Sequence, residues 1–165
     1  MNRCLWVTAA LAWALVLESA QAGSTFWPGS MGQQEAGMSG SPVKAPIPAT
    51  PISPPGPEAP ESHARWSGLW TGWMARNRQL DVNIAVTAIS PEKVDVVYAV
   101  ASARIAPTES AAEGKFVDNE LQALLPSGAL LIMRMVTPER VEISYDGSKL
   151  SGGTCCTFGV LTRKP

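Results

Sequence analysis

From residue 66 onward, apolar and polar residues alternate with a period of two. The clearest case is residues 80–88, where every second position is apolar: Leu80, Val82, Ile84, Val86 and Ala88. This alternation is typical of a strand with one buried face. A turn at residues 90–93 separates it from a second alternating run, residues 94–100, which we expect to return as its antiparallel partner.

Further short apolar runs follow, separated by turn residues. We predict strands at 115–117, 121–125, 129–137, 141–145 and 154–163, and we interpret the polar stretch 107–114 as the longest loop. Asp118-Asn119 has the composition of a tight hairpin turn. No segment has the pattern of a helix of ordinary length.

Residues 66–73 contain three of the six tryptophans, and their spacing permits two interpretations. Trp66, Trp70 and Trp73 have helical spacing, but Gly68 and Gly72 would each cost a helix about 1 kcal/mol relative to alanine. As a strand, the segment has large residues on both faces, with glycines between them. This pattern suits a bent first strand of a closed sheet. We favour the strand.

These elements predict an all-β domain over residues 64–165. About eight short strands joined by short turns form an antiparallel up-and-down meander, because neighbours in sequence tend to be neighbours in space. Such a meander tends to close into a β-barrel, which removes its exposed edges.

The N-terminal 63 residues have a different composition. Arg3, the apolar run 5–17 and the Ala20-Gln21-Ala22 sequence predict a secretory signal peptide over residues 1–22, with an uncleaved anchor as the alternative. Residues 23–63 hold nine of the fourteen prolines, and we expect a disordered proline-rich linker there. We therefore expect a secreted or periplasmic protein with no membrane span after signal cleavage.

Gly68-Leu69-Trp70 at the head of an eight-strand meander resembles the G-x-W signature of lipocalin-like and avidin-like barrels. The segment also resembles small secreted bacterial β-barrel domains of unknown role. The resemblance implies that Trp70 closes one end of the barrel, packed by an arginine near the end of the last strand. Arg163 stands at the matching position, so Gly68, Trp70 and Arg163 are the expected barrel-closing residues.

Several residues are candidates for binding a small apolar ligand. Met133 and Met135 lie two apart on one predicted strand, where they either pack the core or line a cavity. Polar or aromatic contacts at a barrel mouth are assigned to a second group: Trp70, Thr71, Asn83 and Tyr98.

Cys155 and Cys156 are adjacent, which places them on opposite faces of a strand. Cys156 lies two residues before Phe158, so both share one face of the strand, and we expect this face to point into the barrel. Cys156 then packs as a small apolar side chain, and the Cys155 thiol is free on the outer face. Because a disulfide between neighbouring cysteines needs a rare geometry, we expect Cys155 to form a disulfide dimer with another chain or a mixed disulfide.

The sequence carries no sign of catalysis. His63, the only histidine, precedes the first strand, and no metal-ligand, nucleophile or nucleotide-binding motif is present. A net charge of −1 gives no reason to expect nucleic-acid binding. We expect a non-catalytic binding module without cofactor or metal, for a small apolar ligand. The alternative is a cell-envelope protein-interaction domain with a filled core.

Overall fold

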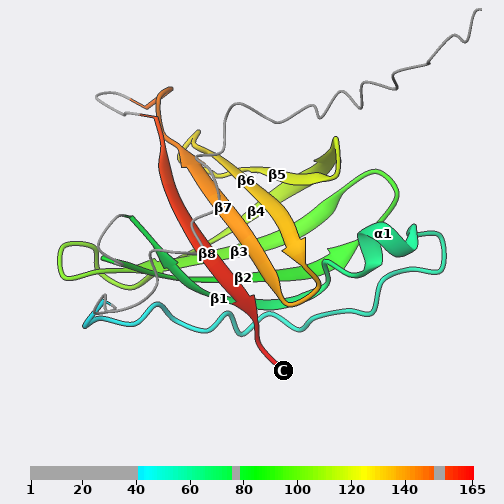
Figure 1. Cartoon of the computed structure of the whole chain (residues 1–165), viewed down its shortest axis with the longest axis horizontal. Helices are drawn as coiled ribbons and strands as arrows, with labels where there is room; N and C mark the ends of the chain where they lie inside the picture. Colours follow the sequence, from blue (N-terminus) through cyan, green and yellow to red (C-terminus); the bar gives the residue numbers. More distant parts are fainter. Residues whose placement is uncertain (1–40, 76–78, 151–154) are drawn as a thin grey trace, which may run out of the picture. The chain divides into compact units, whose positions relative to one another are not determined.

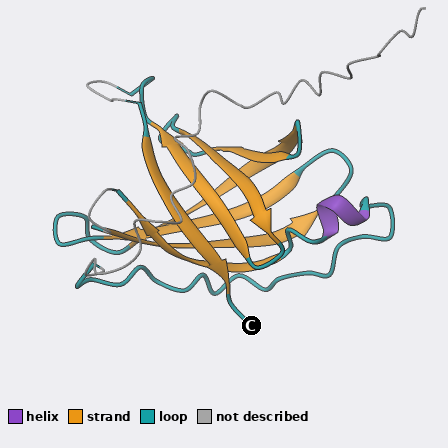
Figure 2. Ribbon diagram, viewed as in Figure 1, coloured by secondary structure: helices purple, strands orange, loops and turns teal. Residues whose placement is uncertain are grey.

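The computed structural model describes residues 41–75, 79–150 and 155–165, and these form one closed antiparallel β-barrel (Figures 1 and 2). The all-β barrel prediction is thereby confirmed. The strands occur in this order: β1 (Gly68–Met74), β2 (Leu80–Ile89), β3 (Val94–Ala101), β4 (Thr108–Val117), β5 (Glu120–Leu124), β6 (Leu130–Thr137), β7 (Arg140–Asp146) and β8 (Thr157–Arg163).

Each strand pairs with its neighbours in sequence, and β1 pairs with β8 to close the cylinder. The strand interpretation of the tryptophan-rich segment is correct from Gly68 onward. Trp66 itself lies before β1, just after the four-residue helix α1 (Glu61–Ala64). Gly72 lies where β1 approaches β8 so closely that a Cβ atom would collide with the carbonyl oxygen of Val160. Gly72 therefore allows β1 to lie close enough to β8 for the barrel to close.

One predicted loop is a strand. Residues 107–114 were expected to be irregular, but β4 spans Thr108–Val117 and pairs along its length with β3. Its inward positions are occupied by small residues such as Ser110 and Ala112, whereas Glu109 and Glu113 point outward and are exposed. Because small inward residues weaken the apolar alternation, the period of two was present but not conspicuous.

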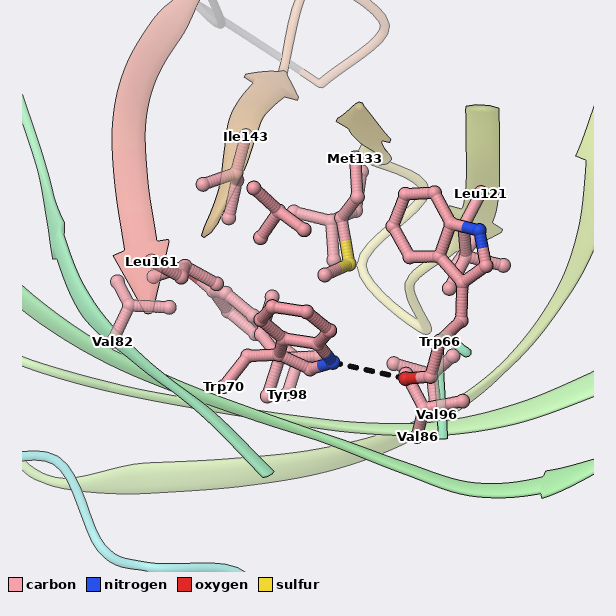
Figure 3. Packing of buried hydrophobic residues seen from close by; sticks show 14 of the residues in the cluster. Trp66, Trp70, Val82, Val86, Val96, Tyr98, Leu121, Met133, Ile143 and Leu161 are labelled. Atoms are coloured by element: carbon pink, nitrogen blue, oxygen red, sulfur yellow. Dashed lines mark hydrogen bonds between the residues drawn. The ribbon is translucent and has the colours of Figure 1, made fainter. Parts of the chain in front are cut away.

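The barrel interior is filled by side chains over most of its length (Figure 3). Trp70 lies beneath Met133, Ile143 and Leu121, all with 0–1% of their surface exposed. An eight-stranded barrel is just wide enough for side chains to fill it, and here they do so. This leaves room for a ligand only toward an end of the barrel.

The proline-rich stretch 41–56 is a strap along the outside of β2, visible as the cyan segment in Figure 1. The Asp81 carboxylate accepts hydrogen bonds from the backbone N–H of Ala45 and from Lys44 Nζ, both at 2.9 Å. The Asn83 amide donates to the carbonyl oxygens of Ala45 and Pro46, each at 3.0 Å. The structure therefore differs from the expected disordered linker in this part.

Small side chains on the outer face of the sheet make room for the strap. Ala99 and Ala101 on β3 are fully buried beneath Val43 and Ala45. Further along, the backbone N–H of Ser53 donates to the carbonyl of Thr87 at 2.8 Å. The strap runs in the same direction as β2.

The predicted signal peptide, 1–22, and the linker residues up to 40 lie outside the described residues.

Candidate functional site

The two ends of the barrel differ in chemistry. One end, here called the closed end, contains α1, the start of β1 and the end of β8. The opposite end, here called the mouth, lies where β1, β3, β5 and β7 finish and β2, β4, β6 and β8 begin. Any binding site inside the barrel has to be at one of these ends, because the middle is filled.

The closed end is sealed by Trp70 and Arg163, which pair across β1 and β8. The guanidinium carbon of Arg163 lies 4.3 Å from the centroid of the Trp70 ring. Trp70 Nε1 donates to the carbonyl of Trp66 at 2.9 Å, as Figure 3 shows. Arg163 donates to the carbonyl oxygens of Ser67 at 2.6 Å, Pro138 at 3.1 Å and Arg65.

Gly68 completes this group of three predicted barrel-closing residues. Its φ of +132° is a conformation that L side chains rarely adopt, and a Cβ atom would lie 2.8 Å from Arg163 Nη1. Partial burial lowers the pKa of the Arg163 guanidinium, opposed by the nearby Glu139, but the group stays charged at any working pH. His63 stacks on Phe116 at 3.8 Å, so this histidine packs the outside of the closed end.

The mouth opens into a cavity of about 230 Å³. Its lining is mostly apolar. Five of the lining side chains carry a hydroxyl group, and no described lining residue is charged. The lining residues are Met74, Leu80, Tyr98, Val100, Ile105, Ser110, Leu125, Pro126, Ser127, Tyr145 and Thr157. The cavity floor is the top of the packed core, since Met74 also belongs to that core.

Two tyrosines dominate the polar chemistry of the mouth. The rings of Tyr98 and Tyr145 lie 6.5 Å apart at an interplanar angle of 26°. Burial, and secondarily the proximity of Tyr145, raises the pKa of the Tyr98 phenol well above its usual range. The Tyr98 hydroxyl is therefore neutral at physiological pH, and it can donate one hydrogen bond to a ligand and accept another.

The predicted ligand-binding residues are not brought together. Only Tyr98 lines the mouth. Trp70 and Met133 belong to the packed core, and Met135 packs against it. Thr71 and Asn83 face one another on the outside of β1 and β2, in an outer groove of about 520 Å³ beside the strap.

Asn83 is occupied there by its hydrogen bonds to the strap. The outer groove is the larger hollow, but strap residues such as Lys44 and Ala45 form part of its lining. The mouth cavity is smaller, but it is more apolar and more enclosed, and these two properties are typical of a small-molecule site.

Cys155 and Cys156 are bonded to one another, which corrects two expectations. We expected a free Cys155 thiol that pairs with a second chain, and an inward Cys156. The inward assignment of Cys156 followed from parity with Phe158. On β8, however, Thr157 lines the mouth and Leu161 belongs to the core, so Phe158 and Cys156 have the outward parity. Cys155 is exposed and Cys156 half-buried. Thr154, the predicted start of this strand, lies outside the described residues.

Of the residues that line the mouth, sequence reasoning selected Tyr98 alone. The hydroxyl-bearing residues that it missed are Ser110, Ser127, Tyr145 and Thr157. Ser110 was hidden in the predicted loop 107–114. Tyr145 ends the alternating run that begins at Val141, which signals an inward position, but only the register Tyr145↔Thr157 shows that it lies at the mouth.

No protein-family profile matches the chain, and no curated protein resembles it significantly in sequence. What the mouth binds is therefore inferred from its own chemistry.

Proposed function

We propose that this protein is an exported, non-catalytic binding module that holds a small, neutral, mainly apolar ligand in the mouth of its barrel. The observation that carries the proposal is the contrast between a filled interior and an apolar, uncharged cavity at one end. This refines the expectation of a ligand deep in the barrel, which the packing of Trp70 and Met133 leaves no room for.

Cavity size limits the ligand. Pockets for drug-sized ligands usually measure about 300–1,000 Å³, whereas an apolar cavity of roughly 150 Å³ is enough for benzene. A mouth of about 230 Å³ therefore matches one substituted six-membered ring or the branched end of an alkyl chain. A whole fatty acid or a fused-ring cofactor would extend far into solvent.

The lining also limits the polarity of the ligand. Burying a charge without a partner costs several kcal/mol, and the described lining offers no ionised group to pair with one. The phenols of Tyr98 and Tyr145 and the hydroxyls of Ser110 and Thr157 suit one or two hydroxyl, ether or carbonyl oxygens. We therefore assign the site to a neutral ring alcohol, phenol or similar compound.

Support for export comes from residues 1–22, which have the three regions of a signal peptide. In the part of the chain that the structure describes, no helix has the length and apolarity needed to cross a membrane. A non-catalytic role is favoured because the described lining contains no histidine, carboxylate or amine that could act as a general base and activate its hydroxyl groups.

A cell-envelope protein is the second candidate ligand. Ile105, which lines the mouth, is 40% exposed, and Leu124, beside the lining residue Leu125, is 60% exposed. A partner protein that inserted one apolar side chain into the cavity would cover this rim. In that case Ile105→Asp and Leu124→Asp would abolish complex formation, whereas free ring compounds would bind weakly or not at all.

The decisive experiment is a titration of the ¹⁵N-labelled protein with benzyl alcohol, cyclohexanol and octanoate, followed by amide chemical shifts. We expect the two ring compounds to shift residues around Tyr98 and Ser110, and octanoate to bind at least tenfold more weakly. Ser110→Phe should fill the cavity with its own ring and remove binding. Ala111→Phe, on the exposed outer face of the same strand, is the matched control. Equal binding by both variants would contradict a mouth site.

A further inference from the structure

Three potential metal-binding side chains lie together at the rim of the mouth. The carboxylate of Asp146 and the sulfur atoms of Cys155 and Cys156 all lie within 4.8 Å of one another. We propose that, when the Cys155–Cys156 disulfide is reduced, these three residues bind one divalent metal ion of the zinc class. This site is separate from the ligand cavity and does not depend on the function proposed for it.

The strand register places these residues together. Asp146 is the last residue of β7, and Cys156 immediately precedes β8. Because Tyr145 pairs with Thr157, continuing the antiparallel register brings Asp146 opposite Cys156. The carboxylate and at least one sulfur are therefore neighbours across a ladder, and their proximity does not depend on how the connecting loop folds.

The Asp146 carboxylate is prepared to act as a ligand. One oxygen, Oδ1, accepts a hydrogen bond from the backbone N–H of Ser148 at 2.8 Å, which helps to hold the carboxylate in place. Hydrogen bonds from the Ser148 side chain and backbone N–H lower the pKa of the Asp146 carboxyl group, as does the charge of Lys149. Lys149 is the nearby opposing cation, and its exposed side chain can turn toward solvent.

The ligand types select the class of ion. Two thiolates and one carboxylate suit a borderline-soft ion such as Zn²⁺ rather than Ca²⁺ or Mg²⁺, which prefer oxygen ligands only. With zinc–sulfur bonds of about 2.3 Å and zinc–oxygen bonds of about 2.1 Å, a tetrahedral site separates its ligand atoms by roughly 3.5–3.8 Å. The carboxylate oxygen needs to approach the sulfur atoms by about 1 Å at most, whereas the two sulfurs, bonded to one another in the disulfide, have to move apart to this spacing once they are reduced. Water would take the fourth position.

Oxidation state controls the site, because a disulfide offers no thiolate. Two thiol molecules, RSH, convert the disulfide into two cysteine thiols and one disulfide, RSSR; the cysteine sulfurs gain the two electrons that the small thiol loses. Binding of the metal ion then releases the two thiol protons. Cys155 is exposed, so both the reductant and the ion can reach it.

The test uses the full chain with Cys4→Ser, reduced by a phosphine and titrated with Co²⁺. We expect thiolate charge-transfer bands and the visible bands of tetrahedral cobalt, saturating at one ion per chain and displaced by Zn²⁺. Asp146→Asn should weaken binding at least tenfold, because losing a direct ligand costs at least as much as losing an outer-shell contact. Asparagine retains an oxygen for the Ser148 hydrogen bond, so this variant should fold.

Two controls separate the site from non-specific binding. Asp118→Asn, in the turn between β4 and β5 at the other end of the barrel, should leave the affinity unchanged. Cys156→Ser should remove the tetrahedral thiolate spectrum. The proposal is overturned if the reduced protein gives no such spectrum, if the oxidised protein gives the same one, if one ion binds per two chains, or if Asp146→Asn binds as tightly as the parent.

Discussion

The closed end and the mouth of this barrel show two different uses of aromatic residues. At the closed end, Trp70 has 0% of its surface exposed, and its ring and Nε1 both have partners. At the mouth, Tyr98 is nearly as buried, but its ring borders an open cavity. Satisfied, close-packed aromatics stabilise a fold, whereas aromatics with spare hydroxyls beside a cavity are available for a ligand.

The largest effect that this comparison predicts is at the closed end. Trp70→Ala should cost about 3–5 kcal/mol of unfolding free energy, because it removes a fully buried indole ring and leaves a cavity in a filled core. Ile105→Ala at the mouth should cost less than about 1 kcal/mol, because this side chain is partly exposed. Urea denaturation measures both values, and similar costs would remove the distinction between the two ends.

The next effect concerns Arg163. Arg163→Ala should cost about 2–3 kcal/mol, because the carbonyl oxygens of Ser67, Pro138 and Arg65 lose their donor and Trp70 loses its cation.

Arg163→Lys keeps the charge but cannot reach three carbonyl groups at once, so it should lie between the parent and alanine. Thermal unfolding of the three proteins gives this order. A lysine variant as stable as the parent would show that charge alone seals the end.

The smallest effect at neutral pH, and the most specific, concerns Tyr98. Tyr98→Phe should change stability by less than about 1 kcal/mol at pH 7, since no described residue hydrogen-bonds to the hydroxyl. Burial raises the pKa of the folded phenol above its unfolded value of about 10. Stability from this group is therefore fully present below pH 10, and it falls above that pH as only the unfolded chain loses the proton.

The slope should approach 1.4 kcal/mol per pH unit above pH 10, and Tyr98→Phe should remove this part of the alkaline loss. Denaturation measured from pH 8 to pH 11.5 tests it. An unchanged alkaline profile in the phenylalanine variant would mean that the phenol ionises freely and that the mouth is wetter than its lining indicates.

Most of the barrel could be predicted from the sequence because its strands alternate large apolar and polar residues. Residues 80–89 and 94–101 show this most clearly, and both strands lie close to their predicted positions. The tight turn also follows from local chemistry, since Asp118 and Asn119 both have positive φ. In β4 the inward positions hold the small residues Ser110 and Ala112, so the alternation of large apolar and polar residues did not reveal this strand.

The mouth was harder to predict because it depends on contacts between distant strands. Tyr98 was selected correctly as a mouth residue, but Thr71 and Asn83 point outward, and parity alone does not show which face becomes the interior. The orientation of Cys156 was mispredicted for the same reason, because parity with Phe158 does not show which face of β8 becomes the interior. The strap was missed because its contacts join side chains of β2 to the backbone of a proline-rich segment.

The strap also determines where this protein can be trimmed or extended. The composition places a boundary near residue 64, yet removing residues 41–56 would uncover the outer alanines of β3 and leave the amide of Asn83 without its two carbonyl partners. The strap begins beside Asp81, at the start of β2, so a label or fusion attached just before Ser41 would emerge near the ligand cavity. Attachment after Pro165, beyond the sealed end of β8, keeps such an addition away from the entrance.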